Sequence, residues 1–178
     1  MTVKSAAQSK RKPGHLPKEE TMADKSQAKP KMIFVNIPVT DLARSVAFYE
    51  AVGATKNPQF SDQTAACMVL SETIYVMLLT HKKFQGFCAK KIIDAKTGVQ
   101  ALFCLSENSK DDVDTTIDKA WAGGGKADPN PKQDYGFMYG RSFEDPDGHI
   151  WEVMWMDVEA AQAAMSQCAP EGGKTAVA

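Results

Sequence analysis

The feature that most constrains the fold is a strand followed by a helix, repeated once along the chain. Residues 32–39 and 99–106 are strand-like, and each run is followed by apolar residues at helical spacing. The first helical stretch runs from Asp41 to Gly53 and the second from Asp111 to Gly123. An acidic N-cap and a glycine stop are therefore twelve residues apart in both. An internal duplication is the simplest interpretation.

Three strand candidates follow each helix. They lie near residues 54–60, 64–70 and 74–80 in the first half, and near 126–128, 137–144 and 149–156 in the second. Each half then has the order βαβββ, with modules at about 32–81 and 99–156. The segment from His81 to Gly98 joins them and includes a Lys90-Lys91 pair. A connection of this length is often the mobile edge of a site, and a plain linker is the alternative.

The composition suits one globular domain with tails, since 43% of the 178 residues are hydrophobic and 24% are charged. Residues 1–31 contain eight Lys or Arg and three Asp or Glu, and they have few large apolar residues, so we expect a disordered basic tail. No aromatic residue is interleaved with these charges, which argues against a nucleic-acid or membrane partner. Met22 is a candidate start. Residues 157–178 are predicted to form a short helix and a frayed tail.

The sequence also favours a cytoplasmic location. No apolar run approaches the roughly 20 residues that cross a bilayer, and the N-terminus lacks the apolar stretch of a secretory signal. The four cysteines are widely spaced, at Cys67, Cys88, Cys104 and Cys168, which favours free thiols in a reducing compartment over disulfides or a zinc site.

A strong turn signal lies near the end of the second module. In Asp145-Pro146-Asp147-Gly148, proline presets φ, the aspartates can accept hydrogen bonds from nearby backbone N–H groups, and glycine tolerates positive φ. The segment therefore predicts a hairpin between the last two strands.

Two segments carry a family resemblance. Asn36 to Tyr49 and Glu144 to Glu152 resemble the two ends of a glyoxalase/bleomycin-resistance domain of the vicinal oxygen chelate superfamily, and the resemblance covers residues 32–156. It implies an α+β fold in which paired βαβββ modules form a curved mixed sheet around a central cavity. Some members use a metal for lyase or dioxygenase chemistry, and others bind a drug without one. The lining residues therefore decide the function.

The resemblance places the usual metal ligands at Phe34, Met77, Gln100 and Glu152. Phenylalanine cannot bind a metal, and methionine is a poor ligand for a hard divalent ion. We therefore expect no cofactor. The alternative is a divalent metal (Ni, Zn, Mn or Fe), for which His81, Gln100 and Glu152 would be an atypical set of ligands.

Because strand side chains alternate between faces, the cavity should have an apolar side and a polar side. The residues expected to bind a substrate are Phe34, Asn36, Met77, Gln100 and Ser142. Glu152 is the catalytic candidate, because a carboxylate buried beside apolar groups is costly to ionise and suits a general acid or base. The alternative is a remnant carboxylate that Gln100 and water satisfy.

The leading prediction is a protein that binds a small organic molecule in its cavity without the usual metal, with Glu152 as acid or base. One alternative is a sequestering protein of the drug-resistance type, which would have no catalysis. Another is a metal-dependent lyase of the lactoylglutathione lyase type, or a dioxygenase. A homodimer is common in the family, and exposed strand edges permit it.

Overall fold

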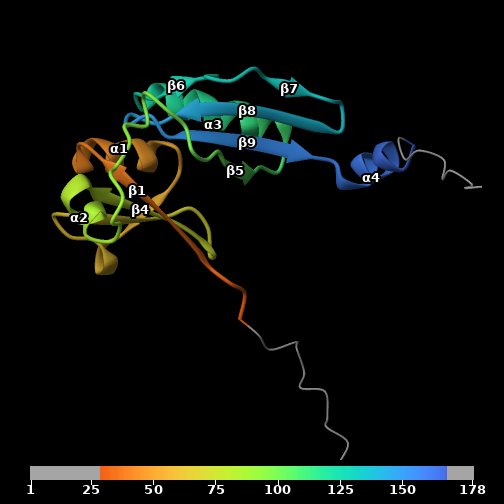
Figure 1. Ribbon diagram of the computed structural model, residues 1–178. Helices are drawn as coiled ribbons and strands as arrows, with labels where there is room; N and C mark the ends of the chain where they lie inside the picture. Colours follow the sequence, from red (N-terminus) through yellow and green to blue (C-terminus); the bar gives the residue numbers. More distant parts are fainter. Residues whose placement is uncertain (1–28, 168–178) are drawn as a thin grey trace, which may run out of the picture. The chain divides into compact units, whose positions relative to one another are not determined.

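The computed structural model describes residues 29–167 of the chain. The predicted basic tail lies almost wholly outside this range, as do Met22 and the predicted frayed end. The described residues form two mixed sheets and four α-helices (Figure 1). The predicted α+β class with two βαβββ modules is confirmed, and the strands of each module form a sheet of their own. None of the helices in this range is long and apolar enough to cross a membrane.

The first module is a four-stranded sheet with one helix against it. In spatial order its strands are β1 (Ile33–Val39), β4 (Ile74–Thr80), β3 (Ala65–Val69) and β2 (Thr55–Asn57), and a short 3-10 helix, η2 (Pro58–Phe60), follows β2. β1 and β4 are parallel, and the other pairs are antiparallel. Helix α1 (Leu42–Ala51) begins after Asp41, whose carboxylate accepts a hydrogen bond from Arg44 N at 3.0 Å. Asp41 is thus the N-cap that the sequence predicted.

The second module repeats this order. Its strands are β5 (Phe103–Ser106), β9 (Ile150–Met156), β8 (Met138–Glu144) and β6 (Lys126–Ala127), and β7 (Gln133–Asp134) pairs with β8. Helix α3 (Lys110–Ala122) begins after Ser109 rather than at the predicted Asp111, because the Ser109 hydroxyl accepts a hydrogen bond from Asp112 N at 3.0 Å. α2 (His81–Gln85) opens the connecting loop, and α4 (Val158–Gln167) lies beyond the end of β9 (Figure 1).

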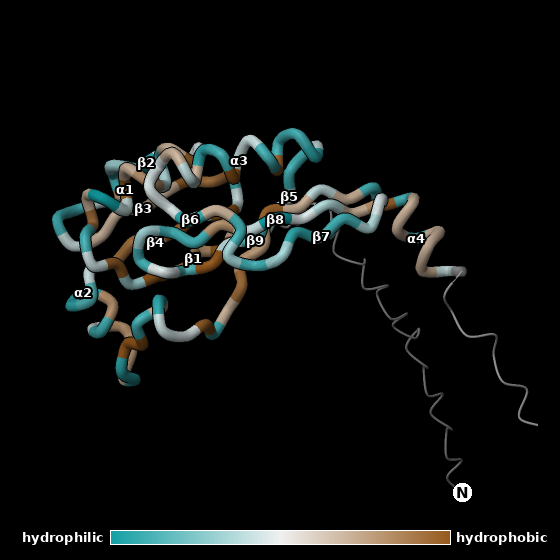
Figure 2. Tube along the Cα trace, turned by 90° about the horizontal axis from the view of Figure 1, so that it is seen from above, coloured by the Kyte–Doolittle hydropathy of each residue, from teal (hydrophilic) through white to brown (hydrophobic). Residues whose placement is uncertain are grey.

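One hydrophobic core serves both modules. Each sheet packs one face against its own helix, so that alternate residues of β1, such as Ile37 and Val39, are buried. Figure 2 shows hydrophobic residues along β1 and β4 and hydrophilic residues around α2. The core is continuous across the junction, because the ring of Phe48 on α1 lies 5.8 Å from the ring of Phe143 on β8.

The turn between β8 and β9 binds the first module through Asp147. The carboxylate accepts hydrogen bonds from Thr40 N at 2.9 Å and Ser45 Oγ at 2.6 Å, and it forms an ion pair with Arg44 at 2.9 Å. Burial favours the neutral acid, but these donors together outweigh it, so the pKa of Asp147 lies below its usual value. An ionised carboxylate of one module is thus held by polar groups of the other.

A second buried contact runs from α1 to the same turn. Tyr49 Oη donates to Asp145 Oδ2 at 2.8 Å and accepts from Trp151 Nε1 at 2.9 Å. Burial raises the pKa of Asp145, and burial together with the adjacent Asp145 raises the pKa of Tyr49 well above its usual value. Tyr49 therefore stays a neutral donor at physiological pH, and its hydroxyl links α1 to β9.

We expect Asp147→Asn to lower the free energy of unfolding by about 1–3 kcal/mol at neutral pH, because charge-assisted hydrogen bonds at a buried position are lost. A carboxylate with a lowered folded pKa stabilises the fold above its unfolded pKa, near about 3.9, and this stabilisation disappears as the pH falls through the folded value. In urea denaturation, the gap between wild type and variant should stay constant from about pH 7 to about pH 5 and shrink only below about pH 4. A gap that closes between pH 7 and pH 5 would contradict this account.

Candidate functional site

Three of the predicted substrate-binding residues share the open face of the first sheet. Phe34 pairs with Tyr75 and Asn36 with Met77 across the parallel β1 and β4 ladder, and all four side chains lie on the face opposite α1. The rings of Phe34 and Tyr75 stack with 4.8 Å between centroids, and Phe34 remains 49% exposed. This face therefore offers an aromatic surface beside one amide.

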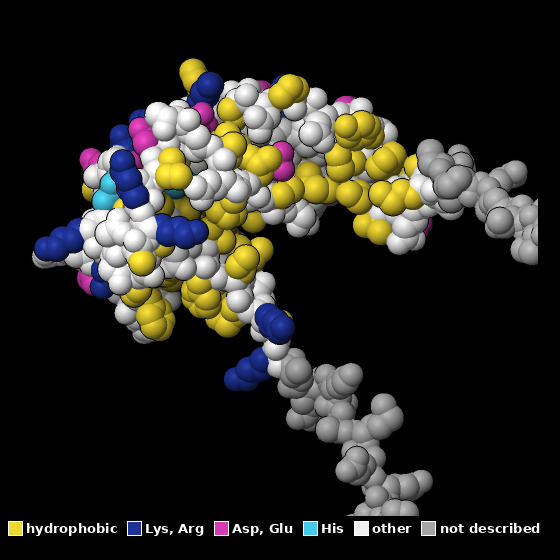
Figure 3. Space-filling model, viewed as in Figure 1, with side chains coloured by type: hydrophobic (Ala, Val, Ile, Leu, Met, Phe, Trp, Pro, Cys, Tyr) yellow, Lys and Arg dark blue, Asp and Glu magenta, His cyan; other side chains and the backbone are white. Residues whose placement is uncertain are grey.

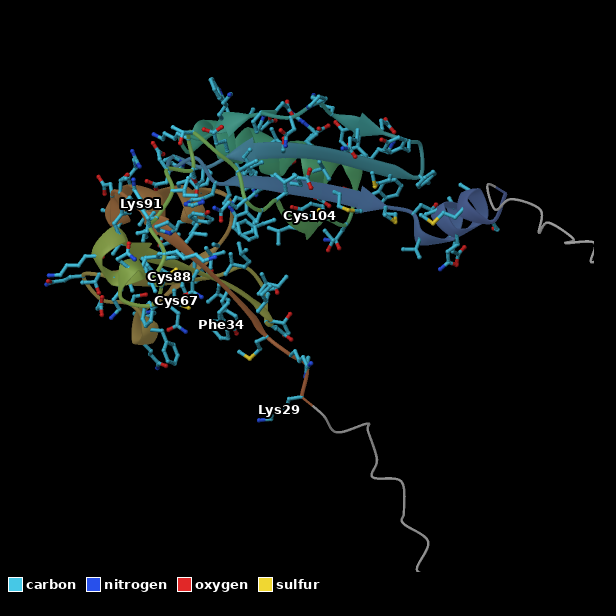
Figure 4. The ribbon with its side chains drawn as sticks, viewed as in Figure 1. Lys29, Phe34, Cys67, Cys88, Lys91 and Cys104 are labelled. Atoms are coloured by element: carbon cyan, nitrogen blue, oxygen red, sulfur yellow. The ribbon has the colours of Figure 1, made fainter. Side chains whose placement is uncertain are left out.

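Two further residues of the predicted site, Ser142 and Glu152, lie next to each other on the second sheet. Ser142 on β8 and Cys104 on β5 both pair with Glu152 on β9, and the three side chains line a pocket of about 210 Å³ together with Met138 and Met154. Figure 4 shows Cys104 on β5 and Phe34 on β1, so the two open faces belong to different sheets. The pocket joins a carboxylate, a hydroxyl and a thiol to thioether groups.

Glu152 is the chemically distinctive group in this pocket. Among the described residues its carboxylate has no hydrogen-bond or ion-pair partner, and its side chain is half-buried rather than buried as the sequence predicted. Desolvation, followed by the charge of Glu152, raises the pKa of the Cys104 thiol, so the thiol remains protonated. Since no described residue binds the Glu152 carboxylate, both of its oxygens are available to a ligand.

Gln100 does not join Glu152. The sequence predicted a strand over 99–106. In the structure β5 begins only at Phe103, and residues 99–102 continue the connecting loop. Gln100 lines a different pocket, of about 330 Å³, together with Asn36. The predicted polar side of the cavity is therefore divided between two pockets, and Gln100 does not satisfy the Glu152 carboxylate.

The pocket around Gln100 lies under the connecting loop. Loop residues Cys88, Lys90 and Lys91 form one wall, while Asn36 and His149 come from β1 and the β8–β9 turn. His149 Nε2 is 2.9 Å from the carbonyl oxygen of Pro38, which can only accept, so Nε2 is the donor. The Lys90-Lys91 pair of the connecting segment thus lies in the lining of this pocket.

The loop and the turn touch through Gly148. Its φ is +103°, and an added Cβ would lie 2.6 Å from Lys96 N and 2.7 Å from Ala95 C. No side chain fits between the two backbones. The close approach fixes the end of the loop against the turn that also binds the first module.

Arg141 lies on the helix side of the second sheet. Its guanidinium forms ion pairs with Asp114 on α3 at 2.7 Å and with Asp128 at 2.6 Å. The hydrogen bond from Arg141 lowers the pKa of Asp114, although partial burial opposes this. Arg141 therefore holds α3 on the sheet, and its charge is already matched by two carboxylates.

The residues at the family's metal positions do not fit a metal. Phe34 presents only carbon, and Met77 lies on the first sheet while Glu152 lies on the second. The alternative set is also dispersed, because His81, Gln100 and Glu152 line three different pockets. Within residues 29–167 there is no group of three or more His, Cys, Asp or Glu that could hold a metal ion.

Comparison with known families gives one match. The model of the Glyoxalase/Bleomycin resistance protein/Dioxygenase superfamily matches residues 31–153. No curated protein matches the chain.

Solved structures share the fold. A hypothetical protein from S. aureus is 24% identical with a TM-score of 0.60, covering 73% of this chain and 97% of that one. A glyoxalase/bleomycin resistance protein/dioxygenase family enzyme from Burkholderia phytofirmans is 18% identical with a TM-score of 0.59, covering 72% and 100%. The fosfomycin resistance protein FosX from Listeria monocytogenes is 16% identical with a TM-score of 0.54, covering 74% and 98%. At these identities the likeness is one of fold.

We expect Gly148→Ala to destabilise the protein more than Gly124→Ala. Both glycines have positive φ, +103° and +91°, so each substitution carries the cost of that conformation, about 1–2 kcal/mol. Only at Gly148 would the new Cβ meet loop backbone, since nothing lies within 4 Å of it at Gly124. Thermal unfolding should show the larger fall in Tm for Gly148→Ala. Equal falls would mean that the loop moves aside at little cost.

Proposed function

Since the chain belongs to the Glyoxalase/Bleomycin resistance protein/Dioxygenase superfamily, we propose that it binds a small organic molecule on the open faces of its sheets. The observation that carries this proposal is the carboxylate of Glu152, which lines a pocket of about 210 Å³ and has no hydrogen-bond or ion-pair partner within residues 29–167. A concave pocket with a few convergent polar groups is where a small-molecule ligand is expected to bind.

The chemistry of the pocket suits a ligand with both polar and apolar parts. The Glu152 oxygens accept hydrogen bonds from a ligand N–H or O–H, and Ser142 Oγ, which already accepts from Asn130 N at 3.2 Å, can donate its proton to the ligand. Met138 and Met154 provide polarisable apolar surface that adapts to the ligand's shape. In the catalytic form of the proposal, Glu152 takes a proton from the bound molecule and returns it.

Sequestration is the second candidate, and the relatives favour neither. One structural neighbour is described as a family enzyme and another as a fosfomycin resistance protein. A binding protein needs the same pocket without proton transfer. The metal-dependent lyase or dioxygenase would require donors other than Phe34 and Met77 at the family positions, so we do not adopt it.

The open faces also support a homodimer. Large apolar side chains are half exposed on or beside them: Phe34 on β1 at 49%, and Leu102, just before β5, at 48%. Figure 3 shows hydrophobic side chains gathered along β5 and β9 and over β1. A second copy of the chain would cover this apolar surface and enclose a ligand more completely. We also propose a cytoplasmic location, because a reducing compartment would keep Cys67, Cys88 and Cys104 as the free thiols they are in the structure.

The role of Glu152 can be tested with Glu152→Gln and Glu144→Gln as its matched control. Glu144 lies on the neighbouring strand but does not line the pocket. Ligands come from a thermal-shift screen of small organic molecules that includes bleomycin and fosfomycin. If Glu152 transfers a proton, its variant should lose turnover by about 10²- to 10⁴-fold and still bind, as measured by calorimetry.

If the protein sequesters its ligand, no turnover is found and Glu152→Gln should weaken binding by about tenfold, equivalent to one charge-assisted hydrogen bond. If neither wild type nor variant shows turnover and both variants bind the ligand as tightly as wild type, Glu152 has no role in binding or catalysis. Loss of binding in Glu144→Gln alone would move the site elsewhere.

The dimer can be tested by sedimentation of Leu102→Asp. A charge on this half-exposed position should shift a dimer to monomer at micromolar concentration without lowering Tm appreciably, because the monomer core is untouched. Trp121→Asp on α3, at a side chain 67% exposed, is the control and should leave the dimer intact. A wild-type protein that sediments as a monomer would refute the dimer directly.

A further inference from the structure

A pocket separate from that of Glu152 lies beneath the connecting loop. It measures about 330 Å³, enough for a small organic molecule. Its apolar wall comes from Phe84, Ile92, Ile150 and other aliphatic or aromatic residues. Asn36 and Gln100 add two side-chain amides, and Gln100 makes no hydrogen bond to any residue in the described part of the chain.

The Lys, Arg, Asp and Glu residues among those that line this pocket are of one sign. Its lining residues include Lys90 and Lys91 and no Asp or Glu, and neither lysine forms an ion pair within residues 29–167. The connecting loop from His81 to Gly98 has five lysines and one aspartate. The rest of the described chain has nine Lys or Arg and seventeen Asp or Glu. The loop is therefore a basic segment on an acidic body, and it attracts anions to this place.

Hydrogen bonds hold this loop in a defined shape. Gln85 Nε2 donates to the carbonyl oxygens of Cys88 at 2.6 Å and Lys90 at 2.9 Å, which folds the loop back on α2. At its far end the loop backbone rests on Gly148, where no Cβ fits. The wall that presents the two lysines is thus fixed at both ends before any ligand arrives.

We propose that the pocket beneath the connecting loop is a second binding site, which takes a small organic anion with an apolar body. The ammonium groups of Lys90 and Lys91 attract the anionic group, the amides of Asn36 and Gln100 hydrogen-bond to it, and the apolar wall covers the body. This site goes beyond the proposed function, because it shares no lining residue with the pocket of Glu152.

The test compares two fluorescent probes of similar shape, anilinonaphthalene sulfonate, which is an anion, and N-phenylnaphthylamine, which is neutral. The variant Lys90→Gln/Lys91→Gln should bind the sulfonate about three- to tenfold more weakly, as expected for two partly exposed charges, and the neutral probe equally well. Lys56→Gln/Lys119→Gln removes the same charge from exposed positions on β2 and α3 and should leave both affinities unchanged. Equal losses in the two double variants would overturn the proposal, since only overall charge would matter.

Alkylation of cysteines shows which pocket is occupied. Cys88 lines the loop pocket and Cys104 the Glu152 pocket, so peptide mass spectrometry after maleimide treatment distinguishes them. Saturating sulfonate should slow the alkylation of Cys88 at least about threefold, and the effect should disappear in Lys90→Gln/Lys91→Gln. Protection of Cys104 instead, or of neither thiol, would overturn this site. Neither result would bear on proton transfer by Glu152, whose test depends on turnover and its own ligand.

Discussion

The structure depends on a carboxylate of the second module that the first module keeps ionised. Asp147 leaves water only because Thr40, Ser45 and Arg44 replace its hydration, and those three residues stand at the start of α1. A buried charge without such partners would cost several kcal/mol, so the two modules cannot separate without exposing or orphaning it. The pocket beneath the connecting loop lies at this junction, since β1 and the β8–β9 turn both contribute to its lining.

Much of the fold could be predicted from the sequence because its signals are local. A cap such as Asp41, a glycine stop and a strand's alternation act within a few residues, and the repeat of all three revealed the duplication. What could not be predicted depends on distant partners. Residues 99–102 have the composition of a strand, yet they follow the loop. The pairing of β5 with β9 begins only at Phe103, which lies opposite Trp151. The short pairing of β7 with β8 likewise has no pattern of its own.

The candidate site shows the same division. Alternation placed Phe34 with Met77 on one face, and Ser142 with Glu152 on another, which is where the structure has them. It could not show that these faces belong to separate sheets, or that Gln100 turns toward the loop, because both depend on how the modules pack. The family resemblance implied that the residues at the four usual metal positions line one cavity. Here that assumption fails, and chemistry predicted for one cavity is divided between a carboxylate pocket and a basic pocket.

The duplication has a further consequence in the hairpins that join the last two strands of each module. The two hairpins occupy equivalent places in a pseudo-symmetric topology, but they are not equivalent in burial. In the first module, Ser71 and Glu72 are exposed, and within residues 29–167 they hydrogen-bond only to residues of their own hairpin. The second module's hairpin, in contrast, is buried against α1 and against the loop. Variation at the first hairpin should therefore be neutral over a long evolutionary drift, while the second is constrained on both sides. Of the two equivalent turns, only the first can change without disturbing contacts to other parts of the fold.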